Sequence, residues 1–168
     1  GGSCFQKDVL NLVYLCRHYG LEEVADYWHQ VIKINDYQKN RFAQKIIDHF
    51  GGDLTGKKIA ILGWGFKANT NDSRESPAIY VTEKLFKAGA ILEIYDPMVS
   101  KESIFSDIDF YWESLKTKDL TTRISVLDSV NRLDLSYDAT AILTEWEVFK
   151  SLDFSKTIVF DGRGVLSS

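Results

Sequence analysis

Hydrophobic residues recur three and four positions apart along the first 50 residues of the chain. Residues 9–19 carry this spacing, with Leu12 and Cys16 on the apolar stripe, and Gly20 follows as a helix stop. A longer stripe of the same period runs over about residues 21–50, which predicts a helix on the order of 40 Å long at ~1.5 Å per residue. Because so long an apolar face exceeds what a small domain covers, we expect it to pack on another subunit or domain.

The rest of the chain alternates strand and helix signals. The predicted strands are residues 58–62, 91–95, 124–126, 139–143 and 157–160, with helices at 77–88 and about 145–151. Strands separated by helices are typical of an α/β fold, a Rossmann-like parallel sheet with helices on both faces. We therefore divide the chain into a helical segment, 1–52, and a sheet domain, 53–168. Residues 98–123 are the least readable stretch.

Composition narrows the classes of protein that the chain can represent. Of its 168 residues, 45% are hydrophobic and 26% are charged, as in an ordinary globular protein, which excludes disorder and low-complexity scaffolds. The net charge of −4 does not favour a nucleic-acid partner, and no apolar run approaches the ~20 residues that span a bilayer. Two cysteines do not make a disulfide framework, so we expect a reducing, cytoplasmic setting. The start at Gly1 without Met suggests a piece of a longer protein.

The first predicted strand runs into a glycine-rich turn. Residues 63–68 have the pattern G-x-G-x-x-A, in which glycines permit a tight turn and a close approach of backbone to phosphate. Asp96 ends the next strand and could accept a hydrogen bond from a ribose hydroxyl. However, a polar loop, 69–77, follows the turn where a helix would normally start, and Asp96 lies further away than the usual ~20 residues. A structural turn that binds no dinucleotide remains an equal alternative.

Cys4 lies close to the predicted start of the first helix. A helix dipole stabilises a thiolate near its N-terminus, and Lys7 adds positive charge. Asp8, four residues on, could orient a water or take a proton. The alternatives are that Cys4 is an inert small residue and that Asp8 is only the N-cap of the helix.

Three basic residues follow strand ends or lie in the loop near one: Lys67, Arg74 and Arg163. In an open parallel sheet, ligands bind at the carboxyl ends of the strands. A lone surface arginine is usually only solvated, but three bases that converge on this edge would suit a diphosphate.

Four segments together resemble the UDP-glucose 6-dehydrogenases of the UDP-glucose/GDP-mannose dehydrogenase family. The segment Gly1–Asp8 is similar to their catalytic cysteine segment, and residues 65–67 with 72–76 are similar to their nucleotide-sugar loop. Residues 144–146 and 160–163 resemble two later motifs of the third domain. The segments occur in family order and cover the whole chain. The Cys-Phe-Gln-Lys-Asp form is closer to the UDP-glucose enzymes than to their UDP-ManNAc or GDP-mannose relatives.

This resemblance implies an NAD-dependent oxidation of UDP-glucose to UDP-glucuronate in two steps. It makes Cys4 the nucleophile that forms a thiohemiacetal and then a thioester, and Asp8 the residue that assists the water and proton steps. The positions that match substrate contacts are Phe5, Phe66, Lys67 and Arg163. Arg74 matches a position that reaches toward NAD, and the glycine-rich turn is then expected to hold the UDP-sugar rather than NAD.

The resemblance also implies what lies outside these residues. The family binds NAD mainly through an N-terminal domain upstream of Gly1, so we expect the chain alone to be inactive. The long helix is then part of a dimerisation region, and a homodimer or larger homo-oligomer is expected. Two alternatives remain: a nucleotide-sugar-binding module without redox chemistry, and a dehydrogenase of another UDP-sugar, of the UDP-ManNAc type.

Overall fold

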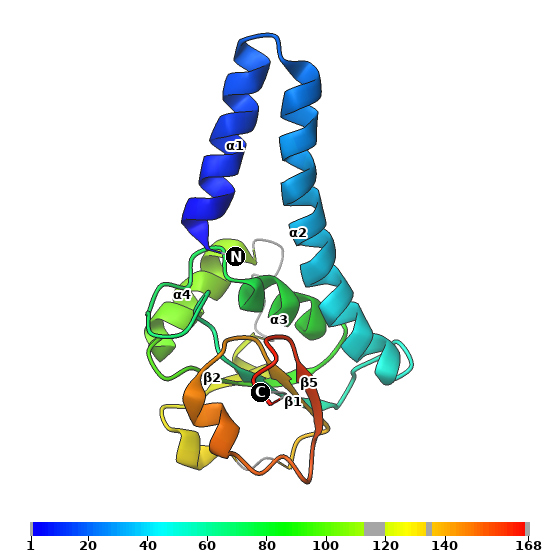
Figure 1. Ribbon diagram of the computed structural model, residues 1–168. Helices are drawn as coiled ribbons and strands as arrows, with labels where there is room; N and C mark the ends of the chain where they lie inside the picture. Colours follow the sequence, from blue (N-terminus) through cyan, green and yellow to red (C-terminus); the bar gives the residue numbers. More distant parts are fainter. Residues whose placement is uncertain (1, 113–119, 134–135, 167–168) are drawn as a thin grey trace.

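Two long helices form an antiparallel pair that projects from the body of the protein (Figure 1). The computed structural model describes residues 2–112, 120–133 and 136–166, so Gly1 of the cysteine segment and part of the stretch 98–123 lie outside the described residues. Helix α1 spans Ser3–His18 and helix α2 spans Glu22–His49. The chain reverses at Gly20, whose φ of 74° gives the left-handed conformation that glycine adopts without strain.

Helix α1 begins six residues earlier than the hydrophobic pattern predicts. Its N-cap is Gly2, with a φ of 94° and no side-chain cap. Cys4 therefore lies within the first turn of the helix rather than one turn before it. Asp8 lies inside the helix, so the alternative that Asp8 is the N-cap is wrong. Asp8 is instead one turn along from Cys4, on the same side of the helix.

The body is built on a five-stranded parallel sheet, which confirms the predicted fold class. The strands are β1 (Lys58–Leu62), β2 (Ile91–Tyr95), β3 (Ile124–Val126), β4 (Ala139–Ile142) and β5 (Ile158–Asp161). Their spatial order is β3-β2-β1-β4-β5, and β1 pairs in register with β2 on one side and β4 on the other. Apart from Lys58, strands β1 and β4 are buried on both faces, which explains why their sequences read as apolar runs, whereas β3 and β5 are partly exposed.

Helices cover both faces of this sheet. One face packs against the C-terminal half of α2, helix α3 (Pro77–Lys87) and helix α4 (Lys101–Tyr111). The other face packs against a smaller apolar cluster that includes the 3₁₀ helix η3 (Glu147–Ser151). A short helix α5 (Leu120–Arg123) leads into β3, and a 3₁₀ helix η2 (Val130–Arg132) precedes β4. Helix α3 begins as its sequence predicts, because Ser76 accepts a cap hydrogen bond from Ala78 N and Pro77 occupies the first position.

The strand order places a crevice at the carboxyl ends of β1 and β4. From β1 the chain moves to β2 and β3 on one side of the sheet, then crosses to β4 and β5 on the other. Open α/β sheets bind ligands at such a switch point. The glycine-rich turn follows β1, and residues 143–146 follow β4, so both predicted motifs meet there.

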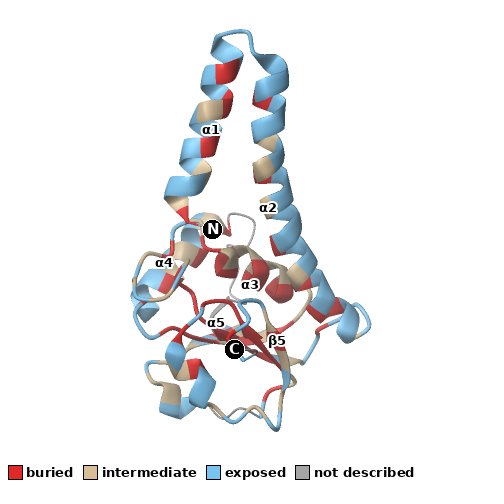
Figure 2. Cartoon of the chain, viewed as in Figure 1, coloured by how far each residue is buried: buried red, intermediate tan, exposed pale blue. Residues whose placement is uncertain are grey.

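Most of the helical pair is exposed (Figure 2), and many of its exposed side chains are large and apolar. A small cluster, formed by Val13, Cys16 and Ala25, is buried between α1 and α2. The large apolar side chains left exposed on the pair and its turn are Phe5, Leu10, Tyr14, Leu15, Tyr19, Leu21, Val24, Tyr27, Trp28, Ile34 and Tyr37. Among the described residues, no helix is both long enough and apolar enough to cross a membrane.

Candidate functional site

The glycine-rich turn after β1 is pressed against the loop that follows β4. Gly63 has a φ of 95°, and a Cβ at this position would collide with the side chain of Thr144. Thr144 donates from its hydroxyl to the Gly65 carbonyl at 2.6 Å and is fully buried. Glycine at position 63 is therefore required for the approach of the two loops, not for the approach of a ligand.

Asp96, at the end of β2, fixes this turn through hydrogen bonds to its backbone. It is 7% exposed and accepts hydrogen bonds from the backbone nitrogens of Trp64 at 2.7 Å and Gly65 at 3.0 Å. It also accepts from the Trp146 indole at 3.2 Å, and from the two backbone nitrogens of residues 98 and 99. The idea that Asp96 accepts from a ribose hydroxyl is wrong, because its oxygens are already occupied inside the protein.

The turn does not fit the pyrophosphate of a dinucleotide. In a dinucleotide-binding turn, free backbone N–H groups and a helix N-terminus face the phosphates. Here Asp96 occupies two of these donors, Phe66 N donates to the Asp72 carbonyl at 3.1 Å, and Ala68 N donates to Glu145 Oε1 at 3.2 Å. The next helix starts only at Pro77, beyond the polar loop. We therefore assign no NAD contact to this turn.

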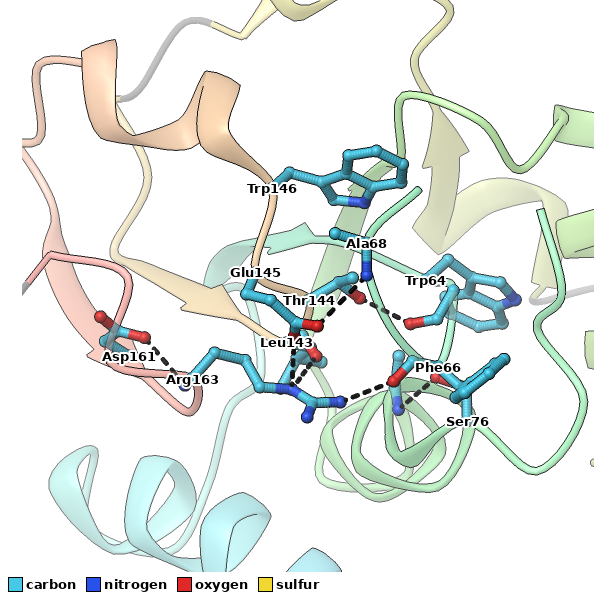
Figure 3. Close-up of polar contacts among 12 residues, drawn as sticks. Trp64, Phe66, Ala68, Ser76, Leu143, Thr144, Glu145, Trp146, Asp161 and Arg163 are labelled. Carbon is cyan, nitrogen blue, oxygen red and sulfur yellow. Dashed lines mark hydrogen bonds and ion pairs between the residues drawn. The ribbon is translucent and has the colours of Figure 1, made fainter. Parts of the chain in front are cut away.

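Arg163 joins the loops that follow β5, β4 and β1 (Figure 3). Its Nε donates to the Leu143 carbonyl at 2.8 Å and its Nη2 donates to the Phe66 carbonyl at 3.0 Å. The Glu145 carboxylate lies 3.6 Å from Nε, and the Arg163 side chain is 29% exposed. Sequence reasoning singled out Arg163 but not Glu145, whose contacts depend on loops that are distant in the sequence.

Phe66 and Lys67 lie on the loop after β1, and the Phe66 carbonyl accepts a hydrogen bond from Arg163. The Lys67 ammonium is exposed, 5.4 Å from the centre of the Phe66 ring, and no ion pair of Lys67 is found within the described ranges. The ring of Phe66 is half-buried while its carbonyl accepts from Arg163. A cation that is free to move and a fixed guanidinium thus flank one aromatic residue, an arrangement that suits an anionic ligand with a ring.

The cysteine segment docks on the same loop, although some 60 residues separate them in the sequence. Gly2 N donates to the Glu75 carbonyl at 3.3 Å. A Cβ on Gly2 would stand 2.9 Å from the Phe66 ring, so only glycine allows this close contact. Cys4 and Phe5 are exposed directly after this contact. The structure therefore brings the predicted nucleophile close to the predicted substrate contacts.

Arg74 lies close enough to Cys4 for the two side chains to interact electrostatically. Its guanidinium donates to both carboxylate oxygens of Asp72, at 2.9 and 2.8 Å. The hydrogen bond with Asp72 raises the pKa of Arg74, and the charge of Cys4 adds to the shift. The same pairing with Arg74 lowers the pKa of Asp72, so the pair stays ionised. Asp8, by contrast, is exposed and lies 3.9 Å from Lys7.

A cleft of about 940 Å³ opens next to Arg163, between α2, α3 and the ends of β4 and β5. Its charged lining residues are the bases Lys39, Arg41, Lys45, Lys84 and Arg163 and the acids Asp48 and Asp161. Gly162 lets the β5 loop reach this cleft, because a Cβ there would stand 3.1 Å from both the Ile142 carbonyl and the Phe42 ring. The excess of bases favours an anion in the cleft.

Comparison with known proteins places these features in a family context. A family model for the UDP-binding domain of the UDP-glucose/GDP-mannose dehydrogenase family matches residues 60–168. UDP-glucose 6-dehydrogenase 1 of Arabidopsis thaliana is 45% identical over 185 residues, a match that covers all of this chain and 38% of the plant protein. UDP-glucose 6-dehydrogenase of Mus musculus is 47% identical over 176 residues, which cover 99% of this chain and 35% of the mouse protein.

Solved structures show the same arrangement. A UDP-glucose dehydrogenase from the archaeon Pyrobaculum islandicum superposes with a TM-score of 0.77 at 29% identity, over 99% of this chain and 35% of that one. A GDP-mannose dehydrogenase from Pseudomonas aeruginosa shares the fold, with a TM-score of 0.68 at 24% identity, over 96% of this chain and 36% of that one. The chain thus spans little more than a third of the length of the relatives it matches.

Proposed function

Because this chain belongs to the UDP-glucose/GDP-mannose dehydrogenase family, we propose that it is the part of a UDP-glucose 6-dehydrogenase that binds the UDP-sugar and supplies the nucleophile. Residues 60–168 are the family's UDP-binding domain. The observation that carries the proposal is the docking of the Cys4 segment on the loop that also bears Phe66 and Lys67. A bound sugar at this loop would have both a cationic anchor for its diphosphate and a thiol within the same site.

The chemistry assigned to this chain is covalent catalysis by Cys4. The thiolate adds to the C6 aldehyde to give a thiohemiacetal, loss of hydride leaves a thioester, and water releases the carboxylate. Asp8, one turn along from Cys4, is placed to orient that water and take its proton. NAD⁺, when bound, would supply the hydride acceptor for both oxidations, first of the C6 alcohol to the aldehyde and then of the thiohemiacetal to the thioester. Arg74, exposed and held by Asp72, is the residue of this chain that we assign to contact NAD.

Two other functions would use the same fold. A nucleotide-sugar-binding module has no need of a thiol in the first turn of a helix beside the binding loop, so the position of Cys4 favours the enzyme. A dehydrogenase for a UDP-ManNAc-type sugar is disfavoured by the identity of 45–47% to UDP-glucose enzymes. Since the chain covers little more than a third of those relatives, we expect no NADH formation from these 168 residues alone.

Titration calorimetry with UDP tests the binding site. We expect weak binding, which Arg163→Ala and Lys67→Ala each reduce about ten-fold, because a charge-assisted hydrogen bond to phosphate contributes about 1.5 kcal/mol. Lys156→Ala is the matched control. Lys156 is an exposed lysine just before β5, at the amino ends of the strands and away from the site, so its loss should leave the affinity unchanged. Melting temperatures identify any loss that reflects unfolding. Equal affinity in all variants would remove both residues from the site.

The apolar helical pair leads us to propose that two copies associate through α1 and α2. Large apolar patches of this kind rarely stay exposed on a monomer. Sedimentation velocity at tens of micromolar should show a dimer, and glutamate at the exposed positions Tyr27 and Ile34 should convert it to a monomer. Phe110→Glu, on α4 and 72% exposed, is the control that should leave the dimer intact. A monomeric wild type would contradict the proposal.

A further inference from the structure

Glu75 has a backbone conformation that few residues of its type adopt. Its φ is 55°, in the left-handed region, where a side chain with a Cβ costs on the order of 1 kcal/mol. Such strain persists only where the surroundings fix the residue through several contacts. Glu75 lies directly before the cap of α3, in the loop that also carries Arg74.

The polar groups of Glu75 contact three separate elements. Its carbonyl accepts from Gly2 N, the N-cap of α1, at 3.3 Å. Its carboxylate accepts from the Tyr80 hydroxyl of α3 at 2.6 Å, and its backbone nitrogen donates to the Tyr111 hydroxyl of α4 at 3.4 Å. The strained conformation thus directs the carbonyl to one helix while the side chain is held by another.

Tyr80 is itself fixed from the side of α2. The buried ammonium of Lys39 lies 4.0 Å from the centre of the Tyr80 ring and pairs with Asp36 at 2.7 Å. The ring of Tyr111 packs edge-on against Tyr80 at 6.0 Å. Burial, together with the hydrogen bond to Glu75, raises the pKa of Tyr80 far above its usual value, so its hydroxyl stays protonated and donates to Glu75 throughout the neutral range.

We propose that Glu75 is a positioning residue for the Cys4 thiol, which fixes the first turn of α1 against the loop that carries Arg74. The contacts form a continuous path from Lys39 through Tyr80 and Glu75 to Gly2, two residues before Cys4. Loss of the Glu75–Tyr80 hydrogen bond frees the strained loop to relax and releases the start of the helix. The relevance of this positioning of Cys4 to catalysis rests on the proposed function. The placement of the thiol itself is measured independently of turnover.

Charge-selective alkylation of Cys4 reports its distance from Arg74. The readout is the ratio of the rates with iodoacetate, an anion, and iodoacetamide, which is neutral, and peptide mapping separates Cys4 from the buried Cys16. In the wild-type chain, the iodoacetate/iodoacetamide rate ratio of Cys4 should exceed that of a free cysteine thiol. Arg74→Gln should lower this ratio about three-fold, as expected for loss of one nearby charge in water. Tyr80→Phe and Glu75→Leu should lower it to a similar extent although both keep Arg74.

Two variants separate positioning from general destabilisation. Glu75→Gln retains an oxygen that accepts from Tyr80 and should not lower the ratio, because loss of the Glu75 charge by itself can only favour the anionic reagent. Tyr27→Phe removes the hydroxyl of an exposed tyrosine on α2 and should have no effect. Hydrogen exchange should quicken in residues 2–10 of Tyr80→Phe but not in β1. Should Glu75→Leu fail to fold, Tyr80→Phe carries the test.

Three results would overturn the proposal. The first is a wild-type ratio in Tyr80→Phe while Arg74→Gln lowers it, because the thiol would then not depend on Glu75. The second is an unchanged ratio in Arg74→Gln, because the thiol would then not be held beside that charge. The third is an equal fall in Glu75→Gln and Glu75→Leu. None of these outcomes depends on whether Cys4 is the nucleophile in turnover.

Discussion

Serine in place of Cys4 is expected to abolish formation of UDP-glucuronate by an active dehydrogenase that contains this chain. A hydroxyl is not deprotonated near neutral pH, so it adds poorly to the C6 aldehyde, and the ester it would give is less labile than a thioester. Because Cys4 lies in the first turn of α1 and is exposed, the substitution removes the nucleophile without opening a cavity. We expect a loss of at least about a thousand-fold, the order seen when a covalent nucleophile is removed.

NADH absorbance during steady-state turnover measures this effect, and mass spectrometry of the protein detects a trapped adduct. Cys16→Ala is the matched control, because Cys16 is the other cysteine of α1 but is buried against α2. That variant should lose some stability and keep its turnover. UDP-glucuronate made by Cys4→Ser at a near wild-type rate would show that the covalent mechanism is wrong.

Replacement of Asp96 by alanine should cause a large loss of stability in the sheet domain. Five donors would lose their acceptor, among them the backbone nitrogens of Trp64 and Gly65 and the Trp146 indole. Buried donors left without a partner cost about 1–3 kcal/mol each where water cannot enter, and partial relaxation reduces the sum. We expect a total of about 3–5 kcal/mol, a large share of the stability of a small domain.

Urea unfolding monitored by tryptophan fluorescence tests this expectation. Asp138→Ala is the control. Asp138 accepts from Lys58 N at 2.9 Å, but it is partly exposed and lies just before β4, at the amino ends of the strands. Its loss should cost less than about 1 kcal/mol. Equal small losses in the two variants would mean that Asp96 does not hold the turn.

The sheet was largely predictable because its central strands are buried on both faces. Such strands read as short apolar runs, and the predicted bounds 58–62, 91–95 and 124–126 agree with β1, β2 and β3. The start of α1 was not predictable in the same way. Its cap is a glycine whose conformation depends on Glu75 and Phe66, and neither contact leaves a local signal in residues 1–8.

In the candidate site, too, features with a local sequence signal were predictable and features that depend on distant contacts were not. Lys67 and Arg163 could be singled out because each follows a strand end, where open sheets bind ligands. The orientation of a strand-end carboxylate cannot be inferred in this way. Asp96 looked suited to a ribose, yet its partners come from residues 64, 65, 98, 99 and 146, which only the folded chain brings together. The role of Glu145 was hidden for the same reason.

The reversal at Gly20 makes the helical pair a long arm, with Cys4 near the end of α1 that docks on the sheet domain. Helix α1 leaves the sheet domain beside Gly2, and its 16 residues extend about 24 Å before the chain turns back. A tilt of α1 by about 5° about that turn would displace its first residues by about 2 Å, enough to separate Gly2 from Glu75. Since a 1 Å misplacement of a reacting group can cost about a hundred-fold in rate, the stiffness of the α1–α2 pair would set how precisely the thiol is placed in the proposed mechanism.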